Sequence, residues 1–206
     1  MDGLMFLWMM WLCWIISTFL LEKQNDWRLR SSASALILII SFPFGIELFG
    51  LQVGVSAALI FLYSMYFIRG FSLSEKLYLF LSSSIIGLSY SSFTLLSFYD
   101  PIMLIMDKKI MVSVILIILS VLLYGDMKFL KKRQLAIIIG MLTGECLTGN
   151  IFIQNKLPYQ IGGSSFLDVL SIIVASGFAL HLFQYLANSQ SSYIKSALKK
   201  GEVKNI

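Results

Sequence analysis

Apolar stretches and short polar segments alternate along the whole chain. Seven stretches hold few or no charged residues, and they cover residues 3–21, 31–50, 53–68, 77–98, 110–124, 135–153 and 165–187. An α-helix rises about 1.5 Å per residue, so about 20 residues cross the roughly 30 Å hydrocarbon core of a bilayer. The pattern therefore predicts an all-α fold: a polytopic transmembrane bundle of about seven helices within residues 1–187, followed by a tail at 188–206.

The segment 31–68 allows a second interpretation. A single re-entrant hairpin there would leave six spans and would break the alternation of loop charges across the membrane. Pro43 predicts a kink, because proline lacks a backbone donor and clashes with the preceding helical turn. Glu47 then lies near the outer surface, either at a helix end before a tight turn at Gly50 or as an outward carboxylate beside a gating kink.

The positive charges orient the predicted bundle. When the stretches are treated as spans and the N-terminus is placed outside, thirteen of the sixteen Lys and Arg residues lie on the inner side. The outer side holds Lys108, Lys109 and Lys156. Positive charge resists translocation, so the distribution predicts an outer N-terminus and a basic cytoplasmic C-terminal tail.

Composition indicates that lipid is the main solvent. The chain is 58% hydrophobic and 13% charged, with a mean hydropathy of +0.83, whereas a soluble domain is about 45–50% apolar and about 25% charged. We therefore expect a multi-pass protein of the cell membrane, with the lipid bilayer and other membrane proteins as partners. The net charge of +5 lies in loops and the tail rather than in a basic patch mixed with aromatics, which argues against nucleic acid.

Metal and cofactor chemistry finds little support in the sequence. Cys13 and Cys146 lie within apolar stretches, and neither has a second cysteine at metal-ligand spacing. His181 is the single histidine, which excludes a site built on several histidines. We expect two buried thiols, no metal and no cofactor.

Glu145 gives the sharpest indication of a site. It lies near the middle of the stretch 135–153, and a charged side chain at the bilayer centre costs about 3 kcal/mol on insertion scales. We therefore expect Glu145 to face the bundle. Two interpretations stay open, a proton-linked or cation-binding site and a neutral carboxyl hydrogen-bonded to a neighbouring helix. Gly140 and Gly144, in GxxxG spacing, predict that this helix is central and closely packed.

Polar residues on the last two stretches predict a cluster around Glu145. If these two helices are antiparallel, their depths in the membrane place Glu145 near Ser176, and Asn150 near Asp168. The candidate intramembrane polar site is therefore Glu145, Asn150, Asp168 and Ser176.

Catalytic residues are not indicated. Asp168 and His181 lie about 140° apart around a helix axis, so they do not form part of a Ser-His-Asp triad. His181 lies on one face with Gln184, either as part of an inward polar patch or as a histidine satisfied within the core. His181 and Glu47 are secondary candidates.

The first apolar stretch resembles a known family. Its features are an early Gly3, the spaced Trp8, Trp11 and Trp14, the pair Thr18-Phe19 and a charged exit at Glu22-Lys23. These features resemble the start of the YphA-type membrane proteins of spore-forming Bacillus relatives. The resemblance implies a cell-membrane protein with no assigned activity and suggests a link to sporulation. It supplies no catalytic or binding residues.

Two functions fit these observations. The first is a non-enzymatic structural or interaction protein that organises partners or lipids during envelope or spore development. The alternative is a small transporter, channel or membrane substrate-binding subunit in which Glu145 is the coupling or ligand residue. An intramembrane enzyme comes third, because the sequence offers no arrangement of nucleophile and base.

Overall fold

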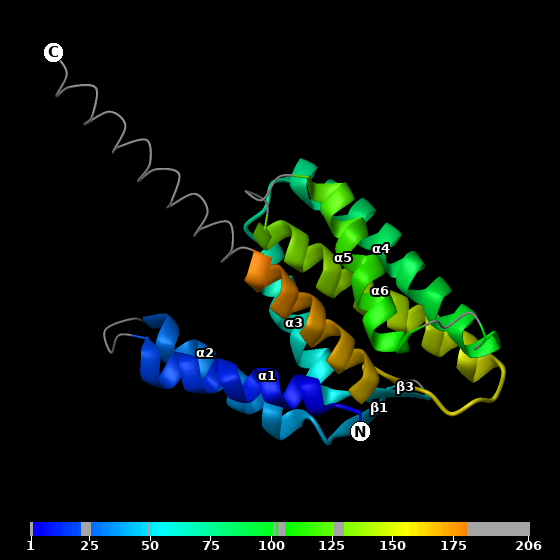
Figure 1. Cartoon of the computed structure of the whole chain (residues 1–206), viewed down its shortest axis with the longest axis horizontal. Helices are drawn as coiled ribbons and strands as arrows, with labels where there is room; N and C mark the ends of the chain where they lie inside the picture. Colours follow the sequence, from blue (N-terminus) through cyan, green and yellow to red (C-terminus); the bar gives the residue numbers. More distant parts are fainter. Residues whose placement is uncertain are drawn as a thin grey trace, which may run out of the picture.

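The computed structural model describes residues 2–21, 26–48, 50–100, 102, 106–125 and 130–180. Its helices are α1 (Leu4–Ile15), continued by the π-helical turn η1 (Ile16–Leu20), α2 (Asp26–Ser41), α3 (Val55–Ile68), α4 (Leu73–Tyr99), α5 (Lys108–Tyr124), α6 (Leu130–Gln154) and a last helix, Ser164–Leu180. Figure 1 shows α3 to α6 and the last helix as neighbours in one bundle, with the α1–α2 pair along one side. The predicted helical-bundle class is confirmed, and a small sheet is added to it.

The sheet replaces part of the helix that was predicted over residues 31–50. After α2 ends, β1 (Gly45–Leu48) pairs antiparallel with β2 (Leu51–Gly54), and β2 pairs in parallel with β3 (Gln160–Ile161). The prediction is wrong beyond Ser41 because Pro43 lacks an amide donor and disfavours helix in the residue before it. The strands then pair the backbone groups that the helix no longer satisfies.

Three helices begin four or five residues earlier than the apolar pattern predicts. α2, α4 and α6 begin at residues 26, 73 and 130, whereas the predicted starts are 31, 77 and 135. At the start of α4, Ser72 and Glu75 form a capping box, in which the Ser72 amide donates to Glu75 Oε2 at 3.0 Å. Hydropathy marks the part of a helix that suits lipid, whereas polar capping residues determine where the helix begins. The predicted residues 181–187 and the tail 188–206 lie outside the described residues.

α4 and α6 form the most extensive helix pair in the described bundle. A Cβ added to Gly87 would lie 2.7 Å from the Gly140 carbonyl oxygen, and one added to Gly144 would lie 2.6 Å from the Gly87 carbonyl oxygen. These distances leave no room for a side chain, so the two backbones meet through glycine. Close approach through small residues is typical of helices that pack within lipid.

The exterior of the bundle is strongly apolar. Phe19, Leu29 and Leu122 are between 72% and 77% exposed, a surface that suits lipid better than water. Cys13 and Cys146 are also exposed, so the expectation of buried thiols is wrong. By length and composition, α4 and α6 could each cross a membrane, while α1 with η1, α3 and the last helix are shorter apolar helices.

Several elements meet at one end of the bundle, here called the sheet end. The three strands, the N-terminus of α1, the C-terminal ends of α4 and α6, and the starts of α5 and the last helix all lie there. Figure 1 shows the N-terminus beside β1 and β3. At the opposite end, Lys132 Nζ forms an ion pair with Glu75 Oε1 at 2.7 Å.

Candidate functional site

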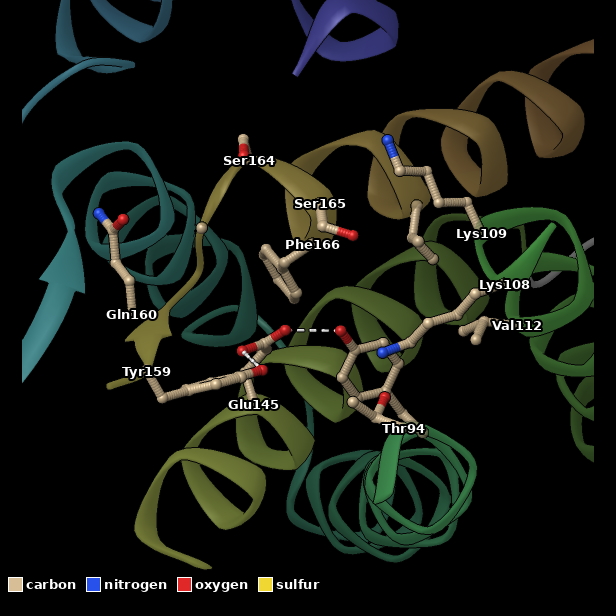
Figure 2. Close-up of a pocket in the computed structure, with 13 residues that line it drawn as sticks. Thr94, Lys108, Lys109, Val112, Glu145, Tyr159, Gln160, Ser164, Ser165 and Phe166 are labelled. Atoms are coloured by element: carbon tan, nitrogen blue, oxygen red, sulfur yellow. Dashed lines mark hydrogen bonds between the residues drawn. The ribbon is translucent and has the colours of Figure 1, made fainter. Parts of the chain in front are cut away.

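A cavity of about 260 Å³ opens between the helices at the sheet end. Its walls come from α4, α5, α6, the segment 159–163 and the first turns of the last helix (Figure 2). The lining residues are Tyr90, Thr94, Lys108, Lys109, Val112, Glu145, Tyr159, Gln160, Gly163, Ser164, Ser165, Phe166 and Val169. The cavity therefore combines both signs of charge with several hydroxyl groups.

Glu145 lies on one wall of the cavity and is held by three donors. The Tyr90 hydroxyl donates to Oε1 at 2.5 Å, and the Tyr159 hydroxyl donates to Oε2 at 2.7 Å. The Gly162 amide also faces Oε2, at 3.5 Å. Glu145 is 3% exposed, so these contacts replace much of the hydration that the carboxyl group loses. Glu145 is hydrogen-bonded to Tyr90 of the neighbouring helix α4, a contact that a neutral and an ionised carboxyl group can both make, so both interpretations of Glu145 stay open.

The loop that carries Tyr159 is fixed by close packing. A Cβ on Gly149 would lie 2.7 Å from the Ile161 side chain and 3.3 Å from the Tyr159 ring, so only glycine leaves room for this loop against α6. Gly162 adopts a φ of +68°, which favours glycine. Burial raises the pKa of Tyr159, and the neighbouring Glu145 raises it further. The phenol therefore stays protonated and acts as a donor.

The opposite wall of the cavity is positive. Lys108 and Lys109 form the start of α5. Lys109 Nζ lies 2.6 Å from Asp168 Oδ2 and 2.9 Å from Asp2 Oδ1, so its charge is compensated. Lys108 forms no ion pair with any described residue, and Figure 2 shows it extending toward Glu145. Burial lowers the pKa of Lys108, and the attraction of Glu145 opposes this shift.

Two neutral groups add unsatisfied hydrogen-bonding capacity. Thr94 is 4% exposed, and its Oγ1 has no hydrogen-bond partner in the described structure. The nearby Tyr90 hydroxyl directs its proton to Glu145, so it cannot donate to Thr94, although its oxygen is close enough to accept from the Thr94 hydroxyl. In the last helix, Leu167 donates its amide to the Gly163 carbonyl at 3.1 Å. The amides that precede Leu167 are therefore the open donors of a helix N-terminus.

The structure does not bring the four predicted site residues together. No hydrogen bond joins any two of Glu145, Asn150, Asp168 and Ser176, all of which are described. Asn150 is exposed and accepts from Gln154 at 3.4 Å. Ser176 donates to a carbonyl of its own helix. Matched depth was a wrong guide: Ser176 lies with Gln134 and Ile137 near the start of α6, whereas Glu145 shares its cavity with Phe166 and Val169 near the start of the last helix.

Asp168 has a separate role from Glu145. It is 1% exposed and accepts the amides of Gly3 at 2.8 Å and Phe6 at 3.1 Å, in addition to its ion pair with Lys109. The carboxylate thus caps α1 from the last helix. Lys109 also lines the cavity, so Asp168 is connected to the site through this lysine.

Of the two secondary candidates, only Glu47 is described, and it does not line the cavity. Glu47 is exposed on β1, opposite Gln52 of β2, and His181 lies outside the described residues. Sequence reasoning missed Tyr90, Tyr159 and Thr94 as site residues, because nothing local distinguishes them from other residues of an apolar helix or loop. Lys108 and Lys109 did carry a signal: they are adjacent positive charges on the side that the charge distribution otherwise leaves nearly free of them.

Comparison with known proteins identifies the family. The model of the family described as YphA-like integral membrane protein matches residues 2–203. The uncharacterized protein YphA of Bacillus subtilis (strain 168) is 24% identical over 210 residues, which cover 99% of each chain. No solved structure matches the chain at a significant level. The match over nearly the whole length, together with an apolar helical bundle, shows that the chain belongs to the YphA-like integral membrane protein family.

Proposed function

We propose that this chain is a multi-pass protein of the cell membrane that binds a small ligand through an oxyanion group, a phosphate or a carboxylate. The binding site is the cavity at the sheet end. One observation carries the proposal: the ammonium group of Lys108, the unpartnered hydroxyl of Thr94 and the N-terminus of the Ser164–Leu180 helix all face this cavity.

Each of these groups favours an anionic oxygen. The amides of a helix N-terminus point outward and carry the positive end of the helix dipole, an arrangement that binds phosphates and carboxylates. Lys108 adds a full positive charge without an ion-pair partner among the described residues. A buried hydroxyl without a partner costs about 1–3 kcal/mol, and a ligand oxygen would remove this cost at Thr94.

The walls of the cavity support binding without large rearrangement. The pairing of Val53 with Ile161 joins the wall segment to the β1–β2 hairpin, and the Gly149 contact holds the same segment against α6. A site whose groups are already in place loses less entropy when the ligand binds. This rigidity suits a receptor or the substrate-binding part of a transporter, the second of the two functions considered from the sequence.

We also propose that the N-terminus lies outside and the C-terminus inside. The support is the distribution of Lys and Arg, which places Lys108, Lys109 and Lys156 outside and thirteen others inside. With this orientation the sheet end faces outward, and the cavity opens toward the outer surface. A role in envelope organisation and a link to sporulation stay predictions; a deletion strain with a defect confined to spore formation would support that link.

Binding of small anions to the purified full-length protein tests the proposed function. Inorganic phosphate, ethyl phosphate and propionate serve as probes in isothermal titration calorimetry in detergent micelles. For each probe that binds the wild-type protein, replacing Lys108 by Met should weaken the affinity about 10- to 100-fold, because a hydrogen bond to a charged group contributes about 1.5–3 kcal/mol.

Lys156→Met is the matched control. Lys156 is another lysine of the predicted outer side, but it is exposed and does not line the cavity. The Lys156→Met substitution should leave the affinity for each probe unchanged. Equal losses in the two variants, or no binding of any probe to the wild-type protein, would contradict the proposal.

A further inference from the structure

We propose that the ligand also carries a primary ammonium group, which Glu145 binds, so that the cavity selects zwitterions such as amino phosphates or amino acids. This inference rests on the proposed function and names the chemical class of its ligand. It starts from two ionisable side chains that line the cavity, Glu145 and Lys108, neither of which forms an ion pair with a described residue.

The two charges attract one another but do not form a pair. Glu145 and Lys108 line the same cavity and would attract one another when both are ionised, yet no ion pair of 4 Å or less joins them. Lys108 extends toward Glu145 across the cavity in Figure 2. A ligand with an acidic group and an ammonium group can lie between them and compensate both charges at once.

The hydrogen bonds of Glu145 leave room for such a group. Oε2 accepts from Tyr159 and from the Gly162 amide, whereas Oε1 accepts only from Tyr90. An ionised carboxylate offers about four acceptor positions, so Oε1 retains a free one. All three donors are neutral, so they orient the carboxylate without cancelling its charge. A buried charge is stable when an opposite charge pairs with it, and a ligand ammonium would supply that charge.

The positive wall selects the other end of the ligand. Lys108, Thr94 and the open amides at the start of the last helix are all donors. The cavity is thus polarised, with an acceptor on α6 facing donors on α4, α5 and the last helix. A plain anion would leave Glu145 uncompensated, and a plain amine would leave Lys108 and the helix N-terminus uncompensated.

The same zwitterionic chemistry occurs in two sources. Ethanolamine phosphate is a free phosphate monoester, and the same ammonium-ethyl-phosphate unit, as a diester, forms the head of phosphatidylethanolamine. Both carry a phosphate and an ammonium separated by two carbon atoms. The experiment therefore compares a dissolved probe with a bilayer that presents the group.

Matched probe pairs test the inference on the full-length protein in nanodiscs of phosphatidylglycerol. Ethanolamine phosphate is compared with ethyl phosphate, and β-alanine with propionate; in each pair only the ammonium differs. We expect the amino member of at least one pair to bind about tenfold more tightly or better. This comparison needs no variant, so a folding defect cannot obscure it.

Two variants then assign the selectivity. Glu145→Gln keeps the shape of the side chain and can still accept from Tyr90, but it lacks the charge. In this variant the ratio of the affinities of the amino probe and its amine-free partner should fall to about one. Lys108→Met should weaken the binding of both probes of a pair by the same factor, so the ratio of their affinities should stay as in the wild-type protein. Monodisperse elution and a cooperative thermal transition show that each variant is folded.

The outcomes separate the inference from the proposed function. If the amine-free probes bind as tightly as the amino probes and depend on Lys108, the zwitterion inference is overturned and the oxyanion site stands. If no probe binds in any bilayer, both fail. If phosphatidylethanolamine in the nanodisc competes with ethanolamine phosphate, the headgroup is the source; if it does not, the solute is the source.

Discussion

Asp168 is the residue that ties the beginning of the chain to its end. Its carboxylate accepts the amides of Gly3 and Phe6 and pairs with Lys109. The charge also lies at the N-terminus of α1, where the helix dipole favours an anion. Since Asp168 is 1% exposed, water cannot replace these contacts.

Replacing Asp168 by Asn should destabilise the protein. The amide matches the shape of the carboxylate but has one acceptor oxygen and no charge, so it cannot serve three donors. We expect a loss of about 2 kcal/mol in the free energy of unfolding, measured by denaturant titration in mixed micelles. Asp100→Asn is the control, because among the described residues the Asp100 carboxylate accepts only from the local amide of Ile102, at 3.3 Å. Equal effects of the two substitutions would contradict this role.

The burial of Glu145 could be predicted from sequence, but its partners could not. The cost of a charge in lipid requires the side chain to face protein, whatever the arrangement of the other helices. Tyr90 and Tyr159 are partners because of the rotation of α4 and the path of a loop, and both depend on packing across the whole bundle. Lys108 was recognised as a topological charge, and only the structure places it opposite Glu145.

The contact between α4 and α6 is the element on which the site depends. It holds Tyr90 on α4 against Glu145 on α6. Gly87→Ala should disturb this contact, because the added methyl carbon would lie 2.7 Å from a backbone oxygen of Gly140, which cannot rotate away. We expect a destabilisation of about 1–3 kcal/mol in the same denaturant titration.

Gly70→Ala is the control for the helix contact. A Cβ at Gly70 meets no atom within 4 Å. This substitution should change the free energy of unfolding by less than about 0.5 kcal/mol. A Gly87→Ala protein as stable as the Gly70→Ala protein would show that the two helices can separate without cost.

The β1–β2 hairpin was missed although a local signal for it exists. Ile46, Glu47 and Leu48 alternate between apolar and polar, and so do Leu51, Gln52 and Val53. This period of two is typical of strands. The overall apolar character of residues 31–68 concealed it, and the third strand comes from a distant loop that no local pattern identifies.

At the scale of the whole molecule, the proposed orientation predicts which loops an impermeant reagent can reach. Single cysteines at positions 156 and 131 are introduced into a Cys13→Ala, Cys146→Ala protein. In intact cells, a membrane-impermeant thiol reagent should label Lys156→Cys but not Lys131→Cys. Both should react after permeabilisation. Labelling of position 131 alone in intact cells would show that the orientation is the opposite of the one proposed, with the cavity open to the cytoplasm.

The bond between Gly3 and Asp168 has a consequence for biosynthesis. Its two residues lie 165 positions apart, and at about 5–20 residues per second the ribosome needs roughly ten to thirty seconds to make the intervening chain. α1 therefore lacks this cap until the last helix has been synthesised. Strand β2 likewise waits for β3. A chain that stops early has neither contact and lacks a wall of the cavity, so the proposed ligand site would exist only in a chain that extends through the last helix.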